Sequence, residues 1–92
     1  MMFRITIHDE AAMTRFVIEG KLAGPWVEEL KKCWQAVLST EPGRFIQVHL
    51  TSVIFVDDLG RELLAAMYRQ GASLVANGLM TQAIISEIMK SE

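Results

Sequence analysis

The most informative segment of this chain is residues 45–67, FIQVHLTSVIFVDDLGRELLAAM. Residues 45–50 and 53–56 are mainly apolar and are separated by one Thr-Ser pair. This predicts a central strand, buried on much of both faces, that runs into a short extended loop. After Asp57-Asp58 the apolar residues change to helical spacing, so a helix is expected, with an apolar stripe formed by Leu59, Leu63, Ala66 and Met67. Gly71 is expected to end that helix in the left-handed conformation.

The N-terminal residues predict a β-hairpin. Residues 3–8 alternate between apolar and polar side chains, which is the period of a strand with one buried face. The small and polar residues 9–12 form the connection, and residues 13–19 are rich enough in β-branched and aromatic side chains to form a second strand. Gly20 is expected to end this strand.

Two further helices and one short strand are expected. Pro25 suits the first position of a helix, where its missing N–H is no loss. The apolar stripe of this helix consists of Trp26, Val27, Leu30, Cys33, Trp34, Val37 and Leu38. Residues 39–44 predict a turn, residues 73–76 a short strand and residues 77–78 another turn. The last helix is expected to carry its stripe on Met80, Ala83, Ile84, Glu87 and Ile88, with Ile85 and Met89 beside it.

The expected element order is therefore ββαβαβα, in a single domain of residues 1–92. Strands that alternate with helices imply parallel neighbours joined by right-handed crossovers, while the opening hairpin adds an antiparallel strand. We expect an α/β fold with a mixed four-stranded sheet packed against helices.

The composition of the chain limits the size of its core and the classes of partner it can bind. With 92 residues, 51% of them hydrophobic, the chain can bury one modest core. Nine basic and eleven acidic residues give a net charge of -2 without a basic stripe, which argues against nucleic acid and anionic membranes as partners. No apolar run has the roughly 18 to 20 residues of a membrane span. The single cysteine, Cys33, is interpreted as a small buried hydrophobe, and we expect a soluble, cytoplasmic protein.

The sequence contains few residues in arrangements that would indicate an enzyme. His49, Asp57 and Asp58 lie near one another in sequence and would in principle supply a base and an orienting carboxylate. The chain has two histidines, however, and no ligand set has metal-binding spacing. It also has neither a glycine-rich phosphate loop nor a nucleophile elbow. We therefore expect neither metal nor cofactor nor catalysis, and interpret His49 as a polar residue at a strand end.

Residues 53–60 (VIFVDDLG), 18–22 (IEGKL) and 71–75 (GASLV) form three short motifs. Together they resemble motifs of the STAS family, the anti-sigma factor antagonist and sulfate-transporter domain. Residues 53–60, VIFVDDLG, resemble the segment in which a strand and loop run into Asp-Ser-Ser-Gly at a helix start, with Asp57 and Gly60 matching. Residues 18–22, IEGKL, resemble the family's hydrophobic-x-Gly-x-Leu stretch. Residues 71–75, GASLV, are similar to its Gly-x-x-Leu entry to the following strand. The resemblance follows nearly the whole chain in order and spacing.

The resemblance implies a regulator of bacterial-type signalling and transcription. In this family a kinase-like anti-sigma factor binds the unphosphorylated domain, and phosphorylation of the first Ser of Asp-Ser-Ser-Gly releases it. Here Asp58 replaces that Ser and Leu59 the second one, while His49 and Ala23 replace two frequent aspartates. The resemblance thus implies partner binding without the usual phosphoswitch, through Asp57, Asp58, Leu59, Gly60, Arg61 and Glu62.

Several alternatives stay open at this stage. Asp58 is either a helix cap, which we favour, or a partial mimic of phosphoserine. Thr51 or Ser52 is a weaker candidate for modification. The partner is a kinase-like anti-sigma factor or, alternatively, another ATPase subunit such as that of a transporter. The chain is expected to be a monomer or a weak homodimer. Its large side chains Trp26, Trp34, Met67, Met80 and Met89 are expected in the core.

Overall fold

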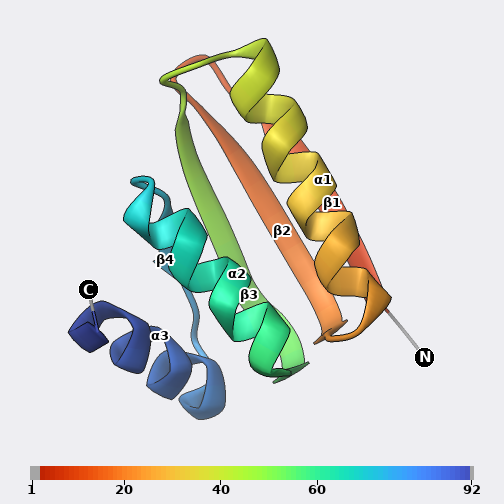
Figure 1. Cartoon of the computed structure of the whole chain (residues 1–92), viewed down its shortest axis with the longest axis vertical. Helices are drawn as coiled ribbons and strands as arrows, with labels where there is room; N and C mark the ends of the chain where they lie inside the picture. Colours follow the sequence, from red (N-terminus) through yellow and green to blue (C-terminus); the bar gives the residue numbers. More distant parts are fainter. Residues whose placement is uncertain (1–2, 92) are drawn as a thin grey trace.

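The computed structural model describes residues 3–91 and confirms the predicted ββαβαβα order. The elements are β1 (Phe3–Asp9), β2 (Met13–Leu22), α1 (Pro25–Thr40), β3 (Phe45–Val56), α2 (Asp58–Arg69), β4 (Ser73–Val75) and α3 (Leu79–Ser91). The sheet has the order β1-β2-β3-β4, in which β1 runs antiparallel to β2 while β2, β3 and β4 are parallel (Figure 1). The mixed four-stranded sheet is thereby confirmed.

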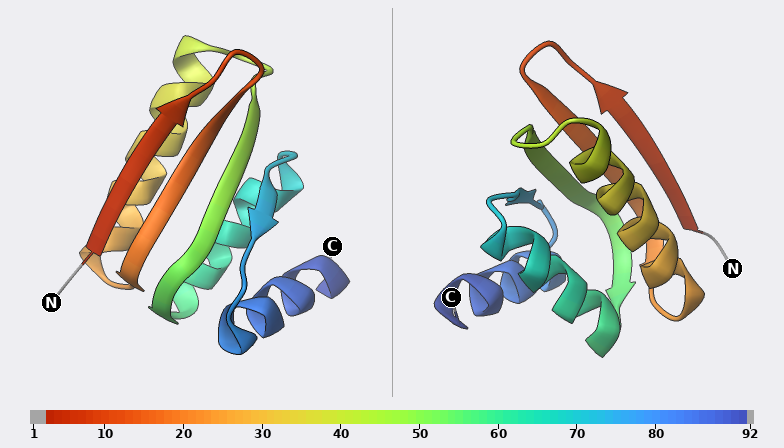
Figure 2. Two further views of the ribbon diagram at one scale, coloured as in Figure 1. Left: turned by 180° about the vertical axis from the view of Figure 1, so that it is seen from behind. Right: turned by 45° about the horizontal axis from the view of Figure 1, so that its top comes forward.

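The domain has two layers, because α1 and α2 cover the same face of the sheet (Figure 2). The prediction that the central strand is buried on both faces is therefore wrong. Along β3, Ile46, Val48 and Leu50 are buried against the helices, whereas Ile54 and Phe55 are exposed. The strand is central, since it lies between β2 and β4, but one layer of helices can bury only one face.

Strand β2 continues past Gly20, contrary to the prediction that this glycine ends it. Gly20 has a φ of 94°, and the pairing with β3 shifts register on both sides of it, between Val17 and Glu19 and between Gly20 and Lys21. A glycine in a β-bulge lets a strand bend without ending its ladder. The strand thus reaches Leu22, which is fully buried.

The ends of the helices follow the sequence signals. Pro25 is the first residue of α1, as predicted. At the end of α2, Gly71 has a φ of 99°, its N–H donates to the carbonyl of Tyr68, and the N–H of Ala72 donates to the carbonyl of Met67. This is a Schellman motif, so the predicted left-handed stop at Gly71 is confirmed.

The prediction for the last helix is confirmed at Ile84, Ile85 and Ile88 and wrong at Met80, Ala83 and Glu87, which are exposed. The buried side chains of α3 are Thr81, Ile84, Ile85 and Ile88, while Met80 and Met89 are exposed. Three consecutive apolar residues at 83–85 made two neighbouring stripes equally plausible from the pattern. The fold selects the stripe that contacts α2 and β3.

The other large side chains largely follow the prediction. Trp34 and Met67 are buried, and Trp26 is partly buried, where it stacks on Phe3 with 5.4 Å between ring centroids. Cys33 is half-buried, and burial, together with the negative charge of Glu29, raises the pKa of its thiol. Between residues 3 and 91, no helix is both long and apolar enough to cross a membrane.

Candidate functional site

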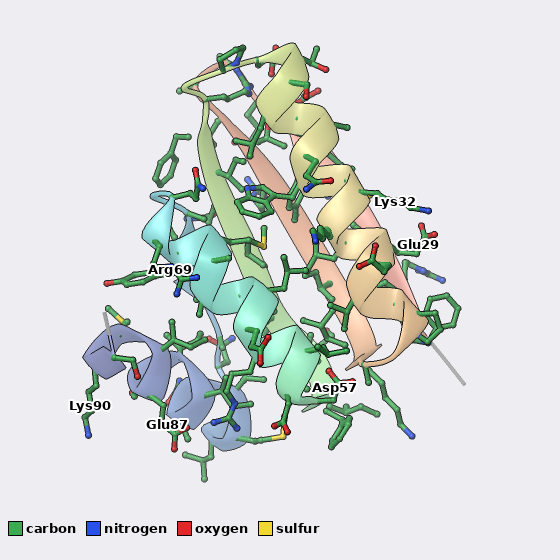
Figure 3. All side chains as sticks on the ribbon, viewed as in Figure 1. Glu29, Lys32, Asp57, Arg69, Glu87 and Lys90 are labelled. Carbon is green, nitrogen blue, oxygen red and sulfur yellow. The ribbon has the colours of Figure 1, made fainter. Side chains whose placement is uncertain are left out.

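The first turn of α2 is held in place by the carboxylate of Asp57. One oxygen, Oδ1, accepts a hydrogen bond from the N–H of Gly60 at 2.7 Å, which is the N-cap interaction of α2. The other, Oδ2, accepts from the N–H of Gly24 at 2.9 Å, immediately before α1. The N–H of Asp57 donates to the carbonyl of Leu22 at 3.1 Å. Asp57 therefore joins the end of β2, the start of α1 and the start of α2 (Figure 3).

Gly60 allows α2 to approach β2 closely. A Cβ atom at this position would lie 2.6 Å from the carbonyl oxygen of Leu22, a distance that carbon and oxygen atoms do not tolerate. The glycine is buried, and its backbone conformation needs no positive φ. Its function is hence to leave space, and the sequence segments 18–22 and 57–60 meet here.

Asp58 lies beyond this cap, in the first turn of α2, with its side chain exposed. Within residues 3–91 its carboxylate has no hydrogen-bond or ion-pair partner. The favoured interpretation of Asp58 as the helix cap is therefore wrong, because Asp57 takes that role. The structural contribution of Asp58 is the weak favourable interaction of its negative charge with the dipole of α2.

Leu59 is also directed to solvent, with 59% of its surface exposed. Other exposed large apolar residues belong to the end of β3 and the start of α3, which lie at the same end of the molecule as the start of α2 (Figure 1). They are Ile54, Phe55, Leu79 and Met80. The start of α2 thus presents an exposed leucine next to the carboxylate of Asp58.

Arg61 and Glu62 have different environments. Arg61 is partly buried, and its Nη1 forms an ion pair with Oε1 of Glu87 at 2.5 Å, which joins α2 to α3. Glu62 is exposed and faces a groove between α1 and α2. The sequence did not predict the pairing of Arg61, because Glu87 is 26 positions away.

The fold does not bring together the histidine and the two aspartates considered as a catalytic group. His49 lies in the middle of β3, paired with Val17 and Val75, so its predicted place at a strand end is wrong. His49 lies eight positions before Asp57, which along a strand corresponds to roughly 26 Å. Its Nε2 lies 2.6 Å from Oε1 of Gln47, and burial, followed by the positive charge of Arg15, lowers its pKa.

The remaining candidates lie elsewhere. Thr51 and Ser52 are exposed on β3. No three His, Cys, Asp or Glu side chains within residues 3–91 gather in a way that could hold a metal ion.

Sequence reasoning missed Gly24, Leu22 and Glu87 as parts of the site. Gly24 has a φ of 56°, and its position directly before Pro25 marked the approach to a helix but gave no sign of a partner. Its bond to Asp57 spans 33 positions, a distance over which local patterns carry no information.

No protein-family model and no curated protein matches this chain. Among solved structures, an anti-sigma factor antagonist from Mycobacterium paratuberculosis superposes with a TM-score of 0.80 at 20% sequence identity, covering 98% of this chain and 82% of its own. A protein of the DUF3478 family from Shewanella loihica, described as having a SpoIIAA-like fold, gives a TM-score of 0.58 at 15% identity, covering 86% of this chain and 71% of its own. The chain therefore has the fold of an anti-sigma factor antagonist, the SpoIIAA-like fold.

Proposed function

We propose that this chain is a non-catalytic regulator that binds another protein through the first turn of α2. The observation that carries the proposal is the exposure of Asp58 and Leu59 on a turn held rigidly by Asp57 and Gly60. A preformed turn loses little conformational entropy on binding, and an apolar side chain beside a charged one combines burial with specificity.

The partner we propose is a kinase-like anti-sigma factor. Support comes from the motif resemblance around residues 53–60 and from the fold shared with an anti-sigma factor antagonist. The motif resemblance implies that the start of α2 contacts the partner, and the shared fold supports the class of protein to which this chain is compared.

The proposed regulator lacks the serine phosphoswitch. Asp58 occupies the position of the phosphorylated Ser, and a carboxylate cannot be converted to a stable phosphate ester. It carries about one negative charge where a phosphoserine carries about 1.5 to 2, so it imitates the modified state only in part. We infer that the domain is held in one binding state.

A second function, as a subunit of a transporter ATPase or another assembly, is favoured by the same residue. A permanent subunit needs no phosphorylation to release it, so the replacement of Ser by Asp58 would be no loss. The two functions differ in the partner and share the binding surface.

Affinity capture from the native host tests the proposal. Wild type is compared with Asp58→Ser and Asp58→Lys, and Gln70→Lys serves as a control because it adds a positive charge at the opposite, exposed end of the same helix. Mass spectrometry that identifies a kinase-like anti-sigma factor, reduced by Asp58→Lys and unchanged by Gln70→Lys, supports the first function. A transporter subunit with the same response supports the second. A set of captured proteins that is the same for all four chains contradicts both.

A further inference from the structure

A groove separates the two helices that cover the sheet. It has a volume of about 560 Å³ and lies between α1 and α2, which diverge from their N-terminal ends (Figure 1). Val27, Trp34 and Leu63 form its apolar floor, and the small side chains of Ala65 and Ala66 leave it hollow. One end reaches Leu59, so the groove is continuous with the candidate binding surface.

Charged side chains along the groove are arranged by sign. Near the N-terminal ends of the two helices, the rim carries Glu28 on α1 and Glu62 on α2. Further along, it carries Lys31 on α1 and Arg69, the last residue of α2. The groove is therefore acidic at the end that meets the candidate site and basic towards the other end.

We propose that this groove binds an amphipathic helix of a partner protein, antiparallel to α1 and α2. The proposal rests on the proposed protein-binding function and names the element of the partner that lies beside the first turn of α2. Acidic residues in the first turn of the bound helix would face Lys31 and Arg69. Basic residues in its last turn would face Glu28 and Glu62.

The dimensions and dipoles agree with this orientation. The twelve residues of α2 give the groove a length of roughly 18 Å, which corresponds to about three turns of a bound helix. An apolar stripe with i, i+3, i+4 and i+7 spacing is the usual way for a helix to fill such a groove. An antiparallel helix also places the negative end of its dipole next to the positive ends of α1 and α2.

A second copy of this chain fits less well as the occupant. The outward face of α1 is charged, with Glu28, Glu29, Lys31 and Lys32 exposed. The exposed large apolar residues of α3 are Leu79 and Met80 in its first turn and Met89 nine positions after Met80, and Lys90 is its one basic residue. Neither helix offers a continuous apolar stripe of three turns.

The test uses two stapled helical peptides of about fourteen residues with the same composition. Both carry the same leucine stripe. One has Glu in its first turn and Lys in its last, and the other has the two exchanged. Binding to the full chain is followed by amide chemical shifts and by tryptophan fluorescence, with Trp26→Phe used to leave Trp34 as the single fluorophore. The first peptide is expected to shift amides on both helices lining the groove and to bind about tenfold more tightly than the second, a difference within the range of a few charge pairs.

Variants locate the binding to the groove. Ala66→Arg fills it and is expected to weaken binding at least about tenfold, whereas Ala36→Arg, on an exposed part of α1 outside the groove, should leave it unchanged. Circular dichroism checks that both variants are folded. The double variant Lys31→Glu with Glu62→Lys leaves one positive and one negative charge at each end of the groove, so it should abolish most of the preference between the peptides.

Three results would overturn the proposal: no groove shift up to roughly millimolar peptide, equal binding of both peptides, or shifts that arise from self-association of the chain. Failure of the groove proposal can be distinguished from failure of the proposed protein-binding function. Partner capture that depends on Asp58 but not on Ala66 leaves the binding function intact and contradicts the groove.

Discussion

The carboxylate of Asp57 accepts a hydrogen bond from the amide of Gly24, 33 positions earlier in the chain. Its other oxygen caps α2 through the amide of Gly60. One side chain thus connects the loop after β2 to the start of the helix on which the proposed binding residues lie. The neighbouring Asp58 contributes to neither bond, so two consecutive aspartates have separate roles.

Asp57→Ala is expected to destabilise the domain by about 2 kcal/mol. Loss of an N-cap side chain costs roughly 0.5 to 2 kcal/mol, and the loss of the bond to Gly24 adds to it. Urea denaturation measures the change in unfolding free energy. Asp58→Ala, the matched control, should change it by less than about 0.5 kcal/mol, the usual range for an exposed substitution. Equal effects of the two substitutions would mean that Asp57 is not the cap.

Gly60→Ala is expected to destabilise by about 1 to 3 kcal/mol, because the new methyl group would meet the carbonyl oxygen of Leu22 at 2.6 Å and force the helix away from β2. Gly78→Ala is the control, since a Cβ there makes only ordinary contact with Thr81 at 3.4 Å. Thermal unfolding compares the two variants. A Gly60→Ala domain as stable as wild type would contradict the close approach.

His49 should make the domain less stable in mild acid. Burial, followed by the charge of Arg15, lowers the pKa of His49 in the folded state, so the unfolded chain binds the proton more readily. Well above the ordinary histidine pKa of about 6.5, neither the folded nor the unfolded chain is protonated at His49, so the free energy of unfolding is unaffected. As the pH falls through that value, the unfolded chain takes up the proton more readily, and the free energy of unfolding decreases. His49→Gln should reduce the loss of unfolding free energy between about pH 7.5 and 5.5. Superimposable pH profiles of wild type and variant would exclude this role.

Cys33 should react slowly with thiol reagents in the folded protein. Burial, with Glu29 as the smaller cause, raises the pKa of its thiol, and the thiolate is the reactive form. A disulfide-exchange reagent at neutral pH should modify the native chain more slowly than the chain unfolded in urea. Glu29→Gln should accelerate the native reaction slightly. A native rate equal to the unfolded rate would show that the thiol is open to solvent.

The order of elements could be predicted because each has a local signal, such as Pro25 at the start of α1 and Gly71 at the end of α2. The predictions failed for features that depend on contacts between elements. Burial of β3 on one face depends on the number of helical layers, and the phase of α3 depends on what it packs against. The bulge at Gly20 could not be told from a strand end without its partner strand.

In the candidate site too, local features could be predicted from the sequence and contacts between distant segments could not. The sequence predicted a helix start at residues 57–62, and α2 does begin there, with Asp57 as its N-cap. Asp57, and not Asp58, is bonded to Gly24 and Leu22, and these two residues are distant in sequence. The sequence also gave no means to see that Ile54 and Phe55 would be exposed near this site.

The central claim is that the first turn of α2 binds a protein. Its most direct test is the dissociation constant of the captured partner, measured by calorimetry for wild type, Asp58→Lys, Leu59→Ala and Gln70→Lys. We predict that the two substitutions in the first turn weaken binding by at least about tenfold each, which corresponds to about 1.4 kcal/mol, and that Gln70→Lys leaves it unchanged. Dissociation constants that agree within about twofold for all four chains, a difference below about 0.5 kcal/mol, would contradict the claim.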